Sequence, residues 1–467
     1  MDRQIAVITI GDERKAFFQM RAGIVEAEIE KLRNRLGLRY ALYLPPPVFS
    51  SSEAQACLDE IQSRRIACVL IHVPVWGTPS LAAKIARTVR GPAMLLGNRR
   101  KDSSSLVCLL ACAGMVEQTQ QKTVRICGDV EDDAVCDEVC AYVEACLAAK
   151  RMSRIKYGAF GGRSIGIGTG VMDPPEWQRL FGCEYDHCDQ YEIVRRAALI
   201  DSERVQRHRE WLESSVQGIE YGGMLTKDSV NRQVRSYLAV KDIVEEREYG
   251  FIGIKCQQEM SDHFALQCVG VALLNNGEDA DGAKKPVCCA CECDGDGALT
   301  MKVLSILAGD APSGLLDIKY FDAEKKMFIL ANCGSLPLSF ASSAGTYLMP
   351  HLFGEAGGAS VQMVAQAGVV TAARLFRANG QYVLACFEGQ AYEVPRETLR
   401  ETAYCYPHAF LCADIDYDWF FQTMNANHLH LVYGAHARAL RYLCAIWGIR
   451  YVNYSTPSSG DSFISEN

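Results

Sequence analysis

Continuous apolar runs separated by helix-like stretches fill the first third of the chain, and they constrain its fold more than any other feature. Residues 5–10, 66–76 and 92–98 form three of these runs, and a helical pattern spans residues 132–150. Strands that are apolar throughout are typical of parallel sheets whose two faces are both covered by helices. We therefore predict a doubly wound parallel α/β domain over residues 1–155.

A glycine-rich segment at residues 161–170 opens a second α/β pattern. This pattern continues with a polar helix at residues 191–214 and with apolar strands at 250–256 and 286–294. The glycines do not complete the G-x-G-x-x-G spacing of dinucleotide sites, and we interpret them as turn residues rather than as a nucleotide site. The pattern predicts a second doubly wound domain over residues 156–315.

The remaining chain, residues 316–467, alternates short apolar runs with turn residues. The pair Asn379–Gly380 between two such runs indicates a β-hairpin, because both residue types tolerate the positive φ angles of a tight hairpin turn. Residues 436–449 carry apolar side chains at helical spacing. We predict a β-rich third domain that ends in a helix.

Composition narrows the classes of function. The chain has 467 residues, of which 49% are hydrophobic and 22% charged, as in globular proteins. Its net charge of −8 argues against nucleic acid or an anionic membrane as a partner, and no apolar run has the length of a signal peptide or a membrane span. The 21 cysteines, an odd number scattered through apolar segments, indicate reduced thiols, and we expect a cytoplasmic protein.

Three acids follow one apolar strand in the segment CECDGDGALTM, which begins at Cys291. The carboxyl ends of parallel strands are where ligands bind in open α/β sheets. We interpret Asp296 as the cap of a helix that begins at Ala298, and a turn can account for Asp294. Glu292 lies within the strand edge between two cysteines, where capping cannot explain it, so we predict a functional role.

Asp317 is the next acid at an element boundary, one helix and one return strand after Glu292. Two carboxylates at strand ends can share one hard divalent cation. The polar segment NANHLH (425–430) supplies His428 and His430, which would point to the same side of a strand. We predict that one of these histidines is a ligand, which tilts the choice of metal toward manganese.

Four cysteines near Glu292 suggest zinc at first sight. They follow the pattern C-C-x-C-x-C, with Cys288, Cys289, Cys291 and Cys293. Thiolate zinc sites use C-x-x-C knuckles, whose turns direct both sulfurs inward. A strand would divide these four side chains between its two faces, so we interpret them as buried thiols.

In these segments the sequence resembles the L-fucose isomerase family and, more distantly, L-arabinose isomerase. GGRSIGIG resembles the start of the family's second domain, and ACECDGDGALTM resembles its segment with a metal-binding glutamate. IKCQQE, ANCGS and NHLHLVYG resemble three further family segments in the same order along the chain. The resemblance implies two N-terminal α/β domains and a C-terminal β-rich, barrel-like domain.

The resemblance also implies roles for individual residues. Glu292 and Asp317 would be metal ligands and catalytic carboxylates, and either could be the base. His428 would be the third ligand, with His430 as the alternative if the register shifts by two. The substrate-binding candidates are Gln257, Trp76, Arg14, Asn332, Asn425 and His430. Trp76 stands at the end of an apolar strand, where the family presents an aromatic side chain to the sugar.

As a member of this family, the chain would be a metal-dependent aldose–ketose isomerase. It would act on an open-chain pentose, deoxyhexose or modified hexose such as a sulfonated one, through a cis-enediol or enediolate intermediate. The implied cofactor is Mn²⁺, with Mg²⁺ and Co²⁺ as alternatives, and the implied assembly is a homo-oligomer, with a hexamer favoured and active sites shared between subunits. The alternative is a non-catalytic sugar-binding or regulatory protein on the same scaffold; the incomplete glycine motif disfavours a nicotinamide-dependent dehydrogenase.

Overall fold

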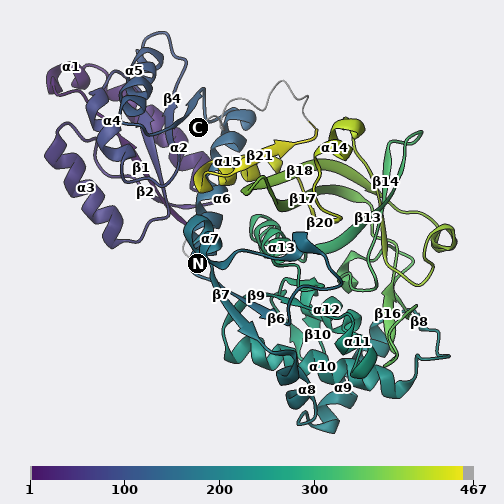
Figure 1. The fold of residues 1–467 in the computed structure, drawn as a ribbon. Coiled ribbons are helices and arrows are strands. Elements are labelled where there is room, and N and C mark those ends of the chain that lie inside the picture. The colour runs from purple at the N-terminus through teal and green to yellow at the C-terminus, as the bar shows by residue number, and fades with distance from the viewer. Residues whose placement is uncertain (1–2, 456–467) are drawn as a thin grey trace. The chain divides into compact units, whose positions relative to one another are not determined.

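The computed structural model describes residues 3–455 and divides into two compact units (Figure 1). Unit 1 comprises Met1–Arg151 and Arg438–Gly448, and unit 2 comprises Met152–Ala437 and Ile449–Asn467. Within residues 3–455, each helix is too short or too polar to cross a membrane. The predicted division into three domains with boundaries near residues 155 and 315 stays a prediction.

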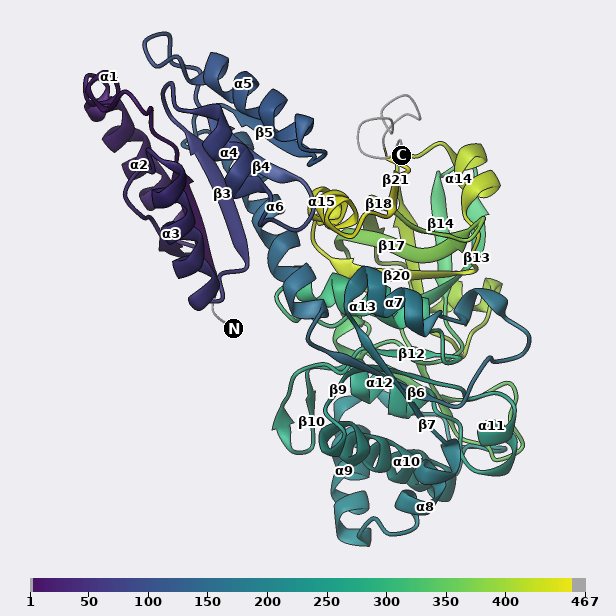
Figure 2. The same ribbon diagram turned by 60° about the vertical axis from the view of Figure 1, so that its left-hand side comes forward.

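Unit 1 is built on a five-stranded parallel sheet of order β2-β1-β3-β4-β5, drawn in purple and blue in Figure 2. The strands are β1 (Gln4–Thr9), β2 (Ala41–Tyr43), β3 (Cys68–Val73), β4 (Ala93–Gly97) and β5 (Thr123–Cys127). The helices are α1 (Lys15–Gln19), α2 (Ala22–Leu36), α3 (Ser51–Ser63), α4 (Pro79–Ala86), α5 (Ser105–Gln118) and α6 (Asp133–Met152).

Both faces of this sheet are covered. Ala6 and Ile8 pack into one core with α3, α4 and α5, while Ile5 and Val7 of the same strand are equally buried on the other face. The strand order reverses direction after β2, and right-handed crossovers therefore place α2 on the face opposite α3. The predicted doubly wound domain is confirmed.

The last helix that the structure describes, α15 (Ala437–Trp447), belongs to unit 1 from Arg438 onward. The ring of Tyr442 contacts Tyr142 of α6 edge-on with the centroids 5.6 Å apart. Arg438 pairs with Glu138 of α6 at 3.1 Å. The predicted helix at 436–449 thus has its apolar face against the first α/β sheet's own helix.

Unit 2 contains a second parallel sheet, of order β12-β9-β6-β7. Its strands are β6 (Lys156–Phe160), β7 (Glu184–Cys188), β9 (Tyr249–Ile254) and β12 (Cys289–Cys291). The helices of this part are α7 (Pro174–Phe181), α8 (Gln190–Ala197), α9 (Ser202–Ser215), α10 (Lys227–Glu246), α11 (Glu259–His263), α12 (Cys268–Asn275) and α13 (Gly295–Leu307). Short strands pair beside it, namely β10 (Glu278–Asp279) with β11 (Gly282–Ala283).

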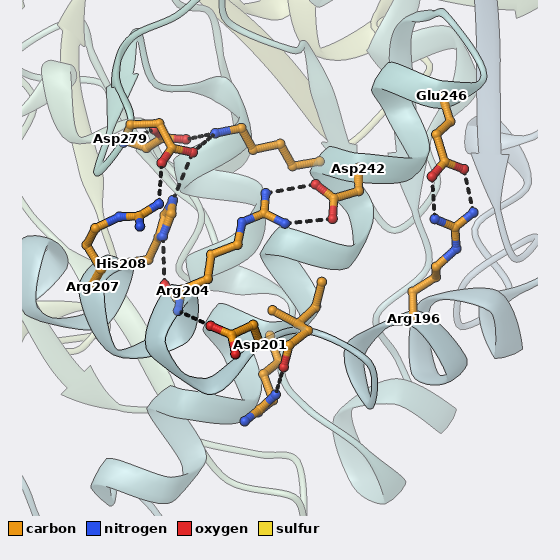
Figure 3. Close-up of polar contacts among 12 residues, drawn as sticks. Arg196, Asp201, Arg204, Arg207, His208, Asp242, Glu246 and Asp279 are labelled. Carbon is orange, nitrogen blue, oxygen red and sulfur yellow. Dashed lines mark hydrogen bonds and ion pairs between the residues drawn. The ribbon is translucent and has the colours of Figure 1, made fainter.

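The predicted helix at 191–214 is wrong in one respect, because the structure divides it into α8 and α9. Asp201 ends the continuity, since its carboxylate accepts the backbone N–H groups of Glu203 and Arg204 at 3.0 Å and starts a new helix. Arg204 then pairs with Asp242 of α10 through two contacts of 2.7 and 2.8 Å, and Arg196 of α8 pairs with Glu246 (Figure 3). Both short helices are thereby fixed to α10.

The rest of unit 2 is an antiparallel barrel. Its strands follow the order β17-β20-β13-β14-β19-β18, β17 pairs with β18 to close the ring, and β21 (Arg450–Asn453) adds to β18. They are β13 (Gly314–Asp322), β14 (Met327–Ala331), β17 (Gly368–Ala378), β18 (Gln381–Tyr392), β19 (His408–Cys412) and β20 (His428–Tyr433). β8 (Gly218–Ile219), β15 (Tyr347–Pro350) and β16 (Ala359–Gln362) form a small separate sheet, and α14 (Tyr417–Thr423) precedes β20.

The barrel confirms the β-rich prediction and its hairpin. Asn379 and Gly380 join β17 to β18 with φ angles of 51° and 80°, as a tight hairpin turn requires. One continuous core joins the barrel to the second parallel sheet, with Ile252 of β9 and Leu316 of β13 among its fully buried members. Because this core fixes sheet and barrel together, side chains from both can build one site.

Candidate active site

Glu292 lies directly after β12, in the turn that leads into α13. Glu292 and Cys293 have φ angles of 61° and 53°, in the left-handed region that non-glycine residues rarely adopt. The Oε2 atom of Glu292 is buried, and its one ionic contact given within residues 3–455 is a long one, to Nε2 of His428 at 3.4 Å. Backbone strain and a buried carboxylate oxygen without a close hydrogen bond both cost stability, and such features gather at functional sites.

Asp317 and His428 are direct partners on the neighbouring antiparallel strands β13 and β20. The Nε2 atom of His428 lies 3.4 Å from Oε2 of Glu292 and 3.5 Å from Oδ1 of Asp317. The side chain of Asp317 is 42% exposed, whereas those of the other two are nearly covered, so Asp317 forms the open side of the site. The structure thus brings the three predicted ligands together.

Asp294 supports His428 from behind, and its predicted role as a simple turn residue is wrong. Its carboxylate caps α13 by accepting the N–H of Gly297 at 2.9 Å. The same carboxylate contacts Nδ1 of His428 at 2.7 Å and forms a fully buried ion pair with Arg374 of β17. Arg374 also donates to the backbone oxygen of Thr169 at 2.9 Å, which gives the glycine-rich segment a structural role.

Asp296 does not cap the helix as predicted, and α13 begins at Gly295 rather than at Ala298. Asp296 is instead buried inside the first turn of α13. Its carboxylate accepts hydrogen bonds from the indole of Trp177 at 3.1 Å and from the hydroxyl of Tyr382 at 3.2 Å. Burial raises the pKa of Asp296 to about 7. The predicted strand at 286–294 is shorter than expected, since β12 ends at Cys291.

The charges of the site perturb its titrating groups. Burial disfavours the imidazolium of His428, but hydrogen bonds and charges from Asp294, Glu292 and Asp317 outweigh burial and raise its pKa to about 10. Burial raises the pKa of Asp317 to about 6, although His428 acts in the opposite direction. The pKa of Asp294 stays well below its usual range, because Arg374 and His428 more than offset the effect of burial. The carboxylates therefore favour the protonated, positively charged form of His428.

His430 points elsewhere. Its Nδ1 atom lies 3.3 Å from the backbone oxygen of Ala373, and its ring packs against the first turn of α13. A Cβ atom at Gly297 would lie 2.6 Å from His430 Nε2 and 2.5 Å from Asp294 Oδ2, so only glycine fits there. Burial holds the pKa of His430 well below its usual range, and this histidine is a neutral packing residue beside the site.

Asn427 is an unpredicted member of the site, and the other predicted polar residues lie around it. The amide of Asn427 donates to Oδ1 of Asp317 at 3.0 Å. Asn425 is exposed in the same loop, and half-buried Gln257 follows β9 beside β12. Asn332 is buried, and its Oδ1 atom accepts three hydrogen bonds from residues 334 and 335, so this oxygen shapes a turn.

Trp76 and Arg14 belong to unit 1. Trp76 is half-buried after β3 and lines a small cavity together with Phe18 and Ser103. Arg14 is exposed and pairs with Asp12 at 2.7 Å. Both residues lie after the carboxyl ends of strands in their own sheet, as the sequence predicts.

The trio of Glu292, Asp317 and His428 fits a divalent cation. Two carboxylates and one imidazole are the donors that manganese and similar metals accept. Oε2 of Glu292 lies 3.4 Å from His428 Nε2, so a cation that displaces the proton of Nε2 can bind both atoms. The contact of Asp294 with the other ring nitrogen is the arrangement that orients metal-binding histidines.

Comparison with known proteins agrees with this geometry. Residues 8–154 match the first N-terminal domain of L-fucose isomerase, and residues 330–455 match the C-terminal domain of L-fucose isomerase. Together the two matches cover more than half of the chain. The chain belongs to the L-fucose isomerase superfamily. The resemblance found in the sequence is therefore confirmed.

Individual relatives of the superfamily are distant. An L-fucose isomerase of Streptococcus pneumoniae serotype 4 is 24% identical over 218 residues, which are 41% of this chain and 37% of that protein. A sulfoquinovose isomerase of Alkalicoccus urumqiensis is 23% identical over 58% of each chain. A sulfoquinovose isomerase of Priestia aryabhattai is 21% identical over 403 residues, which are 83% of this chain and 85% of that protein. The chain thus spans less than two thirds of the first two relatives and most of the third.

Sequence reasoning missed Arg374 and Asn427 and misread Asp294. A signal for Arg374 existed, because an arginine inside the apolar run VVTAARLF must be paired if that run is a buried strand. Its partner could not be found in this way, since Asp294 and Arg374 lie 80 positions apart. Asn427 precedes the predicted ligand directly, and its amide contacts Asp317 only because β13 and β20 pair in the observed register.

Proposed function

We propose that the protein is a sugar isomerase that interconverts an open-chain aldose and its ketose. The observation that carries this proposal is the convergence of Glu292, Asp317 and His428, with Asp294 fixing the histidine. The superfamily's L-fucose and sulfoquinovose isomerases support the same reaction class. A pentose, a deoxyhexose or a hexose modified at C6, such as a sulfonated one, is the proposed substrate.

We further propose that Glu292, Asp317 and His428 hold one Mn²⁺ ion, with Mg²⁺ and Co²⁺ as alternatives. When bound, such a cation supplies Lewis-acid stabilisation of negative charge that develops on the sugar oxygens. The ion pair between Arg374 and Asp294 keeps His428 in the orientation that this role needs. A purely structural role for the trio would leave the buried Oε2 of Glu292 with only a long contact to His428.

The proton transfers fall to the two carboxylates. Isomerisation moves a proton from C2 to C1 of the aldose and a second proton between the two oxygens. We assign the carbon-bound proton to the carboxylate oxygen of Glu292 that does not bind the metal, because the Glu292 side chain is largely shielded from water. Asp317, at the open side and held by Asn427, is placed to manage the oxygen-borne proton.

We also propose that the active site is completed between subunits of a homo-oligomer, with a hexamer favoured. Trp76 and Arg14 of one subunit would then contact the sugar bound by another. The half-buried indole of Trp76 after β3 supports this role, because aromatic faces pack well on the C–H face of a sugar.

A panel of aldoses tests the function directly. The metal-stripped protein would be supplied with Mn²⁺ and with L-fucose, D-arabinose, L-arabinose or sulfoquinovose, and the ketose product would be measured. We expect turnover of at least one sugar by the wild type and a loss of that turnover in Glu292→Gln. Saturable binding of a sugar without any ketose would instead favour the alternative, a non-catalytic sugar-binding protein on the same scaffold.

A further inference from the structure

A cluster of thiols and one imidazole lies beside the candidate active site. Donor atoms of Cys268, Cys333 and His351 all lie within 4.8 Å of one another. The Sγ atom of Cys291 lies 3.9 Å from that of Cys333. These side chains come from four different places in the chain, and Cys291 is the only member of the C-C-x-C-x-C run among them.

The backbone around this cluster is held in place. Cys333 stands in the turn that the side chain of Asn332 organises through hydrogen bonds to Gly334 and Ser335. A Cβ atom at Gly334 would lie 2.5 Å from the side chain of Ser360 and 3.3 Å from that of Cys268, so the turn approaches both closely. The cluster therefore has a defined geometry before any ligand binds.

The distances suit a tetrahedral metal better than a disulfide. Zinc–thiolate bonds of about 2.3 Å place two sulfurs of a tetrahedral site roughly 3.8 Å apart, close to the 3.9 Å between Cys291 and Cys333. Cys268 and Cys291 are almost fully covered, while Cys333 and His351 are half-buried, which leaves a side from which an ion can enter.

We propose that Cys268, Cys333 and His351 form a site for a soft divalent metal, with zinc as the ion, and that Cys291 supplies the fourth ligand when the ion binds. Cys291 lies outside the group whose donor atoms are within 4.8 Å of one another, so its sulfur has to move toward the ion to complete a tetrahedral shell of three sulfurs and one nitrogen. Two hydrogen bonds now converge on the backbone oxygen of Cys333, one from Nε2 of His351 at 2.7 Å and one from the thiol of Cys268 at 3.3 Å. Zinc binding would replace both with bonds from these side chains to the metal.

A zinc ion there would tie the end of β12 to the end of β14, the neighbour of the strand that carries Asp317. Cys291 immediately precedes Glu292, and Cys333 lies two residues after Ala331, the cross-strand partner of Asp317. The inference does not depend on the proposed isomerase activity, because its donor atoms are different and its chemistry is that of thiolates. A zinc ion at this site would be structural.

A cluster of two aspartates and one histidine in unit 2 also brings possible metal ligands together, but lysine and arginine side chains already neutralise its carboxylates. Asp279 and Asp281 lie near His208, but Lys241 contacts both carboxylates, at 2.6 and 2.8 Å, and Arg207 contacts Asp281 at 2.7 Å (Figure 3). The thiol cluster has no comparable pairing with a cation among the contacts of the described residues.

Cobalt titration tests the zinc site with a readout other than activity. The full-length, reduced and metal-stripped protein would be titrated with Co²⁺ alone. We expect thiolate-to-cobalt charge-transfer absorption in the near ultraviolet, together with the intense visible bands of tetrahedral cobalt. One equivalent of Zn²⁺ per chain should remove these bands.

Variants assign the signal to its ligands. Cys333→Ser and Cys268→Ser should lose the thiolate band, and His351→Ala should bind cobalt at least about tenfold more weakly, as loss of one ligand implies. Cys412→Ser, which changes a partly exposed thiol elsewhere in unit 2, and Glu292→Gln should keep the band. Circular dichroism checks folding; if Cys333→Ser unfolds, Cys291→Ser and His351→Ala carry the assignment.

The proposal is overturned if the wild type shows no thiolate band, or if the band survives in both Cys333→Ser and Cys268→Ser. A Cys291–Cys333 disulfide in the protein as purified without reductant would overturn it as well. Loss of sugar turnover in Glu292→Gln with an intact thiolate band would leave the zinc site standing, so the two proposals fail independently.

Discussion

The two parallel sheets of the molecule end in very different polar groups, although both present the carboxyl ends of their strands to possible ligands. In unit 1, Asp12 is buried and pairs with Arg14, and Asn98 donates to Pro74 at 2.8 Å and accepts from Ser103 at 2.8 Å. In unit 2, the buried Oε2 of Glu292 has only a long contact, 3.4 Å, to Nε2 of His428.

The difference shows how polar side chains with a structural role at a strand end can be told apart from those of a reactive site: by whether they already have close partners. Polar groups at the edge of the first sheet satisfy one another within that sheet's own loops. At the edge of the second sheet, three carboxylates surround a single imidazole, and of the three only Asp294 is paired with an arginine. Fold similarity alone would not have distinguished the two edges.

The strongest test of this contrast is removal of divalent metal. We expect a chelator to abolish sugar turnover completely and Mn²⁺ to restore it, because the three donors at the second sheet would be left without their cation. Turnover would be measured before chelation, after it and after metal is added back. Full activity in protein shown to be free of metal would contradict the prediction.

The carboxylates themselves should have the next largest effect. Glu292→Gln and Asp317→Asn should each lower kcat by at least about a hundredfold, the usual scale for acid–base groups, without loss of fold. Glu184→Gln, at an exposed position at the start of β7, is the matched control and should turn over sugar like the wild type. Either site variant with unchanged kcat would refute the assignment of that carboxylate.

Changes to Asp294, which contacts the ring of His428, should have a smaller effect than changes to Glu292 or Asp317, but one that can be measured as weaker metal binding. Asp294→Asn should weaken Mn²⁺ binding by about 10- to 100-fold, the range found for groups that orient a metal-binding histidine. His428→Ala should bind Mn²⁺ more weakly than His430→Ala, since only His428 faces the carboxylates. Binding would be followed by the electron paramagnetic resonance of free Mn²⁺. If His430→Ala instead bound Mn²⁺ more weakly than His428→Ala, the ligand would be His430.

Trp76, at the edge of the first sheet, should contribute only contacts with the sugar, so its replacement should reduce activity less than the changes above. Trp76→Ala should lower kcat/KM less than Glu292→Gln does. If Trp76 acts on a neighbouring subunit, co-expressed Trp76→Ala and Glu292→Gln chains should recover part of the activity in mixed oligomers. Mixed oligomers of verified composition that stay as inactive as Glu292→Gln would place Trp76 in its own subunit or in the core.

The smallest expected effect concerns the pH dependence of stability near Asp296. Its folded-state pKa of about 7 lies above that of an unfolded aspartate, near 3.9, so its contribution to stability is fully present below about pH 4 and is lost as pH rises toward 7. Asp296→Asn stays neutral and can accept the same two hydrogen bonds. The Tm of Asp296→Asn relative to the wild type should therefore rise between pH 5 and 8; a difference independent of pH would disprove this.

The sequence determined the α/β and β-rich regions, because continuous apolar strands, helical spacing and the Asn379–Gly380 turn are local signals. It also identified Glu292 as an acid that capping could not explain, and the family resemblance supplied Asp317 and His428. The exact end of β12 and the break at Asp201 were missed, since strand ends and helix starts depend on which backbone groups a side chain can reach.

Tertiary structure alone decided which side chains meet. The pairing of β13 with β20 sets Asp317 opposite His428, and closure of the barrel brings Arg374 to Asp294 across 80 positions of sequence. The thiol cluster likewise joins residues from four separate segments, which no spacing rule links. Local patterns encode strands and turns, but a site built from several strands depends on register and chain closure, which only the folded core fixes.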